Sequence, residues 1–145
     1  MSVDVEDYFQ VSAFENTINS KDWDRLPCSV EGNTNRILEL FAMHDVKATF
    51  FMLGWVAERY PGLVRRVVDA GHELASHGYS HVRVTQQSPQ AFIEDVSKTR
   101  KLLEDIAGCE VQGYRAASYS IVNETLWAHD LLQEAGYRYS SSVYP

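Results

Sequence analysis

The chain has 145 residues, of which 45% are hydrophobic, 12% aromatic and 23% charged, with a formal net charge of −7. A chain of this length can form one compact domain with a single hydrophobic core, and it is too short for two domains of ordinary size. The negative charge argues against nucleic acid or an anionic membrane as the main partner, because both attract basic surfaces.

Three features of the sequence bear on where the chain works. No stretch approaches the roughly 20 apolar residues of a membrane span, and the opening Met-Ser-Val-Asp-Val-Glu-Asp lacks the basic and apolar regions of a signal peptide. Cys28 and Cys109 lie far apart in no CxxC pattern, which favours two unpaired thiols in a reducing compartment, although one disulfide would also fit. We therefore expect a cytoplasmic protein.

Short apolar segments alternate with longer amphipathic ones along the chain. In chain order, the sequence predicts a strand at 2–5, an irregular loop at 8–34, a helix at 35–44, a strand at 48–53, a helical segment at 55–70, a strand at 73–76, a helix from 88 to about 107, a strand at 111–115, a helix at 123–135 and a strand at 139–144. Such alternation predicts a parallel α/β fold, either an open sheet or a barrel. In both, catalytic residues gather at the C-terminal ends of the strands.

Glycine and proline set the expected helix boundaries. Pro61 opens a new turn within the helical segment at 55–70, and Gly71 and Gly108 follow helix ends as natural stops. Ser88 and Pro89 stand in the favoured order for the start of a helix, with serine as N-cap and proline in the first turn.

A run of acids, Asp4, Glu6 and Asp7, follows the first apolar segment. Carboxylates this close repel one another unless a cation or an arginine compensates them. Taken alone, such a run is most simply a solvated turn, with a metal site as the alternative.

The third predicted strand leads into His77-Gly78-Tyr79-Ser80-His81. Two histidines four residues apart can present two ring nitrogens to one metal, and Gly78 would let the chain leave the strand sharply. The pattern is weak in isolation and gains weight because it follows a strand, as the acids do. His44, His72 and His129 are expected to be structural.

Arg115 and Tyr119 follow the fourth predicted strand. An arginine on the same rim as the acids could hold a carboxylate in orientation. Two histidines and one carboxylate leave coordination positions open, as is typical of a catalytic metal site, with zinc as the default ion. Such a site activates water and polarises a carbonyl, while a second carboxylate accepts a proton. The sequence thus predicts metal-assisted hydrolysis of an amide or ester.

These motifs, in this order, resemble those of the polysaccharide deacetylases that share the NodB homology domain (carbohydrate esterase family four). That family has an acidic motif on its first strand, His-(Ser/Thr)-x-x-His on its third and an Arg-x-Pro-x-Tyr-like motif on its fourth. The similar stretches here are SVDVEDYF, ASHGYSH and GYRAASYS, and KATFFMLGWVAERYP and AGHELASHGYSH are similar to the family's second and third strands. The opening SVDVEDYFQVSAFE resembles the branch associated with exosortase-linked exopolysaccharide clusters, which is related to peptidoglycan deacetylases and allantoinase-like proteins.

The resemblance covers residues 1–145 and implies a distorted (β/α)7 barrel of the NodB type, of which this chain is the N-terminal portion, truncated before the last strands. It implies that Asp4 is the catalytic base, that Arg115 orients it, and that His77 and His81 bind a divalent metal. The region of Tyr119 would line the acetyl pocket. The general-acid histidine of the family, which lies on a late strand, is missing from the chain.

Three positions depart from the family pattern. The commonest family motif has two adjacent aspartates, which would favour Asp7 as the third metal ligand, whereas strand alternation puts Asp4 and Glu6 on one face and favours Glu6. Gly78 stands where the family usually has Ser or Thr, and Ala116 replaces the usual proline.

The resemblance implies an N-deacetylase that releases acetate from an N-acetylated exopolysaccharide, in a chain that could form homo-oligomers. Two alternatives stay open. One is an allantoinase-like hydrolase of a small cyclic amide, and the other is a carbohydrate-binding relative that has lost catalysis.

Overall fold

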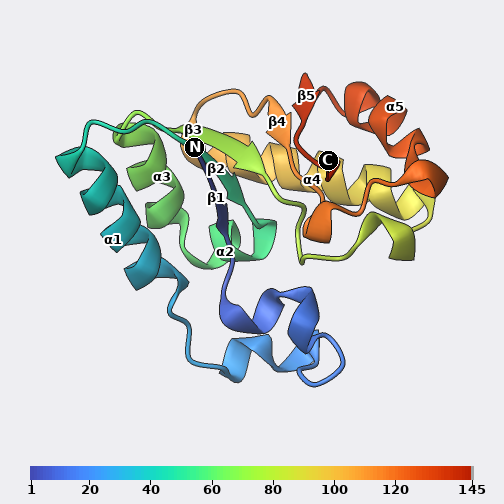
Figure 1. Cartoon of the computed structure of the whole chain (residues 1–145), viewed down its shortest axis with the longest axis horizontal. Helices are drawn as coiled ribbons and strands as arrows, with labels where there is room; N and C mark the ends of the chain where they lie inside the picture. Colours follow the sequence, from blue (N-terminus) through green and yellow to red (C-terminus); the bar gives the residue numbers. More distant parts are fainter. Residues whose placement is uncertain (145) are drawn as a thin grey trace.

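A computed structural model describes residues 1–144 and has a sheet of five parallel strands (Figure 1). The strands are β1 (Ser2–Val5), β2 (Thr49–Met52), β3 (Glu73–Ser76), β4 (Gly113–Tyr114) and β5 (Tyr139–Ser140). They lie side by side in the order in which they occur along the chain. Because right-handed crossovers between consecutive parallel strands put the helices on one face, this order favours a barrel-type sheet over an open doubly wound one.

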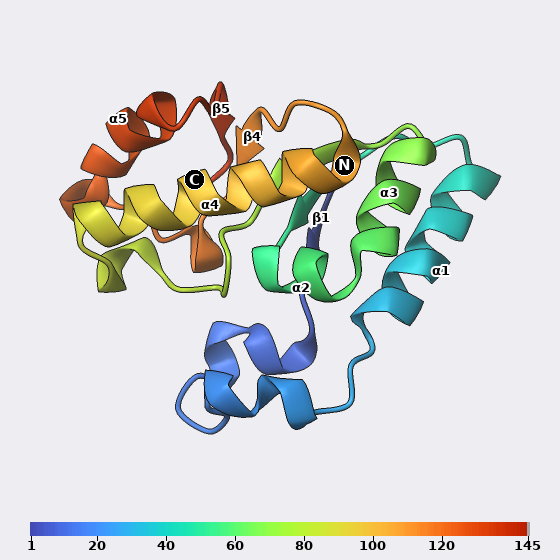
Figure 2. The same ribbon diagram turned by 180° about the vertical axis from the view of Figure 1, so that it is seen from behind.

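The longer helices connect these strands. They are α1 (Val30–Met43), α2 (Gly54–Arg59), α3 (Pro61–Asp69), α4 (Pro89–Ala107) and α5 (Trp127–Glu134). Both α3 and α4 pack against β3, and α4 crosses in front of the sheet when the molecule is viewed from behind (Figure 2). Within residues 1–144, no helix combines the length and apolar character that a membrane crossing requires.

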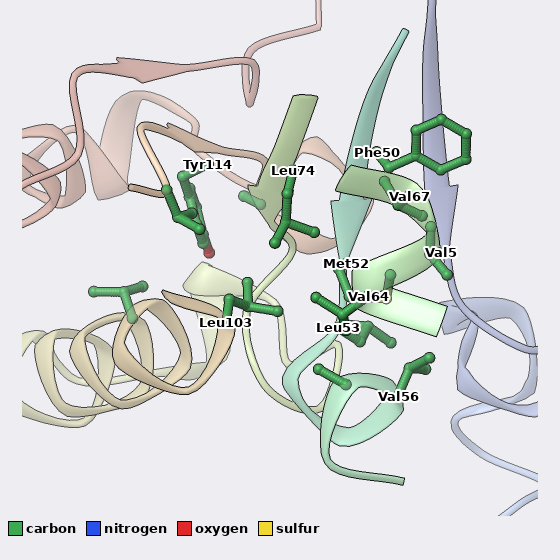
Figure 3. Packing of buried hydrophobic residues seen from close by; sticks show 14 of the residues in the cluster. Val5, Phe50, Met52, Leu53, Val56, Val64, Val67, Leu74, Leu103 and Tyr114 are labelled. Carbon is green, nitrogen blue, oxygen red and sulfur yellow. The ribbon is translucent and has the colours of Figure 1, made fainter. Parts of the chain in front are cut away.

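The two faces of the sheet have different side chains. Val5, Met52 and Leu74 point toward the helices and belong to the hydrophobic core, where they meet residues of α2, α3 and α4 (Figure 3). Asp4 and Phe51 are paired in register between β1 and β2 and lie outside that core cluster. Strand alternation therefore turns Asp4 toward the face that the helices leave open.

The helix boundaries follow the capping residues seen in the sequence. Ser88 accepts a hydrogen bond from the amide of Ala91 at the start of α4, with Pro89 in its first turn. Gly108 ends α4 in the left-handed conformation, with φ 69°, which costs glycine little because it has no Cβ. Pro61 begins α3 and separates it from α2.

The predicted irregular loop at 8–34 was partly wrong. The segment contains three short 3-10 helices, Tyr8–Gln10, Ser12–Phe14 and Ser20–Arg25, and α1 starts at Val30 rather than at residue 35. We call residues 8–25 the 3-10 segment. It lies beyond the ends at which β1 and β2 finish (Figures 1 and 2). The predicted strands at 111–115 and 139–144 are each reduced to two residues, and Cys28 and Cys109 are free thiols, as expected.

Candidate metal centre

Glu6, His77 and His81 converge at the C-terminal edge of the sheet. Glu6 follows β1, and the two histidines lie in the turn after β3. One ligand atom from each of the three residues lies within 4.8 Å of the others. The two motifs, separated by some 70 residues of sequence, therefore meet as the sequence predicts.

The contact between Glu6 and His81 fits a shared cation. Glu6 Oε2 lies 3.0 Å from His81 Nε2, yet this buried oxygen has no hydrogen-bond partner within residues 1–144. Two electron-pair donors at this distance without a hydrogen bond are arranged as metal ligands are, because atoms bound at about 2 Å to one ion lie about 3 Å apart. The residues present thus suit a divalent metal.

Both histidines are in the protonation state that a metal requires. His77 Nδ1 lies 2.8 Å from the carbonyl oxygen of Arg115, and because a carbonyl only accepts, Nδ1 carries the proton and Nε2 keeps its lone pair. Burial lowers the pKa of His77, and burial together with the neighbouring His77 lowers the pKa of His81 to about 4. Both rings are therefore neutral at neutral pH, and neutral imidazole is the form that binds metals.

The surroundings of Glu6 disfavour the ionised form of its carboxyl group. Burial raises its pKa to about 7, and the negative charge of Asp4 adds to the rise. A cation bound between Glu6 and the two histidines would stabilise the ionised form and offset this cost.

Asp7, the alternative ligand, has a structural role instead. Its Oδ2 accepts hydrogen bonds from the amides of Ser29 (2.6 Å) and Val30 (2.8 Å), and its Oδ1 accepts from the amide of Tyr8 and the hydroxyl of Ser29. The side chain is thus committed to the N-terminus of α1, where a negative charge also complements the helix dipole. Glu6 is the acid that joins the histidines, as strand alternation favours.

Arg115 holds Asp4 in place. Its Nη1 lies 2.6 Å from Asp4 Oδ1, and its Nη2 donates to the hydroxyls of Ser2 (3.0 Å) and Ser141 (2.9 Å). Its guanidinium also lies over the ring of Phe51, 4.0 Å from the centroid, an attractive cation–π geometry. Contacts on several sides fix the guanidinium, and the guanidinium in turn fixes one oxygen of Asp4.

The two acids Asp4 and Glu6 and the two histidines face a cavity of about 300 Å³, which we call the metal cavity. Its walls include Asp4, Glu6, His77, His81, Ser118 and Tyr119. The structure therefore places Tyr119, predicted to line the acetyl pocket, in the same space as the acids and histidines. Ser12 of the 3-10 segment reaches across one side, with its hydroxyl 2.6 Å from that of Ser118.

The turn that carries the histidines is braced by two helices. The amides of Gly54 and Trp55, which start α2, donate to the carbonyls of Gly78 and Tyr79 at 2.9 Å each. From α4, Asp95 Oδ1 accepts from the amide of Tyr79 at 3.0 Å. Gly78 has φ 72°, which a Ser or Thr would adopt only with strain. Gly78 therefore allows a tight turn after β3, and the hydrogen bond from the Tyr79 amide to Asp95 holds that turn in place.

The sequence interpretation missed Asp95 and the serines around Arg115. Asp95 sits within the buried stripe of α4 between Phe92 and Thr99, and an acid at helical spacing inside an apolar stripe is the signal that could have revealed it. Burial raises the pKa of this carboxyl. Ala116, which replaces the usual proline, donates its amide to Ser142 Oγ at 2.9 Å, a bond that proline could not make.

The chain matches the sequence model of a known family, described as polysaccharide deacetylase, over residues 22–140. It is 34% identical over 96 residues to the peptidoglycan-N-acetylglucosamine deacetylase of Bacillus cereus, a match that covers 66% of this chain and 35% of that protein. Among solved structures, a polysaccharide deacetylase from Mycobacterium smegmatis has a TM-score of 0.78 at 27% identity, covering 98% of this chain and 49% of the other.

A second similar solved structure belongs to a protein described as lacking enzymatic activity. It is a CE4 family pseudoenzyme from Bacillus anthracis, with a TM-score of 0.66 at 29% identity, covering 71% of this chain and 37% of the other. In each comparison the chain spans half or less of its relative. Because the family model matches most of its length, the chain belongs to the polysaccharide deacetylase family.

Proposed function

We propose that this chain carries the metal and base part of an N-deacetylase that hydrolyses N-acetyl groups on a bacterial glycan and releases acetate. One observation carries the proposal. Glu6, His77 and His81 bring three possible ligand atoms within 4.8 Å of one another, and Asp4 lines the same cavity. A three-ligand site with a separate carboxylate beside it is the arrangement that hydrolytic metal sites use.

The side chains divide the work of amide hydrolysis. Glu6, His77 and His81 would hold the ion, and zinc suits this His/His/carboxylate set. When bound, a divalent cation there would make a water molecule more acidic and polarise the acetamide carbonyl. Asp4, with Oδ1 held by Arg115, has Oδ2 to accept a proton from the attacking water. Tyr119 would contact the acetyl group from the cavity wall.

The nature of the glycan is a finer proposal. The opening SVDVEDYFQVSAFE resembles the exosortase-linked branch, which supports an exopolysaccharide of N-acetylhexosamine units. The similarity to a peptidoglycan-N-acetylglucosamine deacetylase supports a related amino-sugar polymer. Both are neutral N-acetylated sugars at the reacting unit, so the chemistry required of the metal cavity is the same. A seven-stranded barrel completed beyond residue 145, together with a late general-acid histidine, belongs to the same proposal.

A carbohydrate-binding protein without catalysis is the second candidate, favoured by the similarity to a pseudoenzyme. The set of Asp4, Glu6, His77 and His81 speaks against it, because an acid whose pKa burial raises to about 7 costs stability, and strongly perturbed acids are concentrated in active sites. The allantoinase-like alternative keeps the same ligands and differs only in substrate.

The test is acetate release from N-acetylglucosamine oligomers by the zinc-loaded chain. Asp4→Asn should lower the rate by about 10²- to 10⁴-fold, the usual contribution of a general base, without loss of zinc binding. Asp69→Asn, at an exposed acid at the end of α3, should leave the rate unchanged. Sugar binding without acetate release would favour the binding protein, and release from a cyclic amide alone would favour the allantoinase-like reading.

A further inference from the structure

The open face of the sheet carries a second group of polar side chains, at the ends where the strands begin. Tyr139 in β5 donates its hydroxyl to Glu73 Oε1 at 2.7 Å, and Thr49 in β2 donates to Glu73 Oε2 at 2.6 Å. Glu73 is the first residue of β3, so one carboxylate joins three strands. These three residues do not line the metal cavity, and the proposed reaction makes no use of them.

The tyrosine reaches Glu73 by crossing the strand that lies between them. β4 separates β3 from β5 in the sheet, and Gly113 of β4 is paired in register with Tyr139. A Cβ atom on Gly113 would lie 2.2 Å from both Cζ and the hydroxyl oxygen of Tyr139, far inside van der Waals contact. The ring therefore lies directly on the backbone of β4, and any other residue at this position would push it away from Glu73.

The same two strands hold Arg115 closer to the metal cavity. Arg115 comes two residues after Gly113, and Ser141 comes two residues after Tyr139, so strand alternation puts all four on one face. Arg115 Nε donates to the carbonyl oxygen of Ser141 at 3.2 Å, and its Nη2 donates to the Ser141 hydroxyl at 2.9 Å. The placement of β5 beside β4, which the tyrosine ring fixes where the strands begin, therefore determines how Ser141 meets Arg115.

We propose that Tyr139 and Gly113 are positioning residues for Arg115 and, through it, for Asp4. The tyrosine ring fixes β5 against β3 and β4. Ser141 is thereby placed to hold the guanidinium where its Nη1 meets Asp4 Oδ1 at 2.6 Å. The effect on catalysis rests on the proposed function, in which Asp4 is the base, whereas the effect on Arg115 does not.

The test removes the hydrogen bond between Tyr139 and Glu73 and follows Arg115 by NMR in the zinc-loaded chain. Tyr139→Phe keeps the ring over Gly113 and removes only the hydroxyl. The Nε–H signal of Arg115 reports on its bond to Ser141. In this variant the signal should shift, and its exchange with solvent should become about fivefold faster, a factor that corresponds to the usual net worth of one hydrogen bond.

Acetate release from N-acetylglucosamine oligomers separates a positioning role from a purely structural one. In Tyr139→Phe, kcat should fall about fivefold with KM unchanged, because Asp4 acts on the attacking water and not on the binding of the sugar. Zinc affinity should also be unchanged, since the substitution leaves the three metal ligands in place.

Two substitutions of the carboxylate distinguish the hydrogen bond from the charge. Glu73→Gln keeps an oxygen that can accept from Tyr139 and gains an amide that can donate to Thr49, so the Arg115 signal and kcat should match those of the unmodified chain. Glu73→Leu removes both acceptors and should behave as Tyr139→Phe does. The two changes combined should be no worse than either alone, because they remove the same bond.

Arg138→Gln is the matched control. Arg138 adjoins Tyr139 and pairs at 3.2 Å with Glu110, which precedes β4, so the change removes a different link between the same two segments. The Arg115 signal and kcat should stay as they are. A signal that does not move in Tyr139→Phe, or that moves equally in Arg138→Gln, would overturn the inference.

Two further outcomes separate the inference from the proposed function. A shifted Arg115 signal with an unchanged kcat would show that Tyr139 does not position Asp4, and would overturn the inference while the proposed function stands. A chain that releases no acetate even without substitution would overturn the proposed function, and the NMR signal would still decide whether Tyr139 holds Arg115.

Discussion

Adjacent acids at the end of β1 have separate tasks because successive side chains of an extended chain point to opposite sides. Glu6 joins His77 and His81, while Asp7 turns back to bind the first amides of α1. The sequence predicted this division only in part. Alternation favoured Glu6, but the partner of Asp7 lies 22 residues away along the chain, and no local pattern connects the two.

Glu6→Gln and Asp7→Asn form a matched pair of isosteric changes at neighbouring positions. Glu6→Gln should weaken zinc binding by at least the roughly 10- to 100-fold that loss of a supporting group costs, with little loss of stability in the metal-free chain. Asp7→Asn should lower the free energy of unfolding by about 2 kcal/mol, since an amide nitrogen would face donors that now bind a carboxylate. Calorimetric zinc titration and urea unfolding in chelator measure the two effects. Zinc affinity lost equally in both variants would contradict the division.

Among the elements, the parts that could be predicted are those fixed by local sequence. The strands at 2–5 and 73–76 and the helix begun by Ser88 and ended by Gly108 have the expected bounds. The 3-10 segment could not be predicted, because helices of three to six residues are too short to show a detectable periodicity. The turn after β3 was expected from Gly78, but its braces come from α2 and α4, and such long-range contacts leave little trace in a single sequence.

Asp95→Asn tests the brace from α4 through its pH dependence. Burial raises the pKa of Asp95 above its ordinary value of 3.8, so the folded chain holds this proton more tightly than the unfolded chain does. The contribution of the carboxyl to stability is therefore largest at low pH and is lost as pH rises through the raised pKa. Asparagine keeps an oxygen for the Tyr79 amide and does not titrate.

The free energy of unfolding of Asp95→Asn, relative to the unmodified chain, should therefore increase as pH rises above 3.8, the ordinary pKa of an aspartate. Urea unfolding in chelator at several pH values provides the measurement. Asp105→Asn, at an exposed acid of the same helix, should show no such trend. A difference that stays constant with pH at Asp95 would rule out a buried, titrating brace.

At the scale of the whole molecule, the metal centre joins segments that the chain connects only through two crossovers. Glu6 comes from the end of β1, and the histidines come from the turn after β3, with β2 between these strands in the sheet. A bound ion would thus link the first and third strands at their C-terminal ends. Its binding energy would then be added to the stability of the fold.

Zinc at 100 times its dissociation constant should raise the free energy of unfolding by about 2.7 kcal/mol. Thermal or urea unfolding with zinc and with chelator gives the comparison. His77→Ala should abolish the gain, whereas His129→Ala, in α5, should keep it. Equal stability with and without zinc, under conditions where binding is saturated, would show that the ion does not bind the native fold selectively.

Arg115 makes the position of Asp4 depend on residues in other strands. Besides Asp4, it bonds Ser2 in β1 and Ser141 just after β5, so the guanidinium joins the two edge strands of the sheet. Any shift that opens or flattens the curvature between these strands would move the guanidinium and, with it, Asp4. If Asp4 is the base, as proposed, its reactivity is tied to the shape of the sheet, and a change at Ser2 or Ser141 would displace this carboxylate through Arg115 without touching Glu6, His77 or His81.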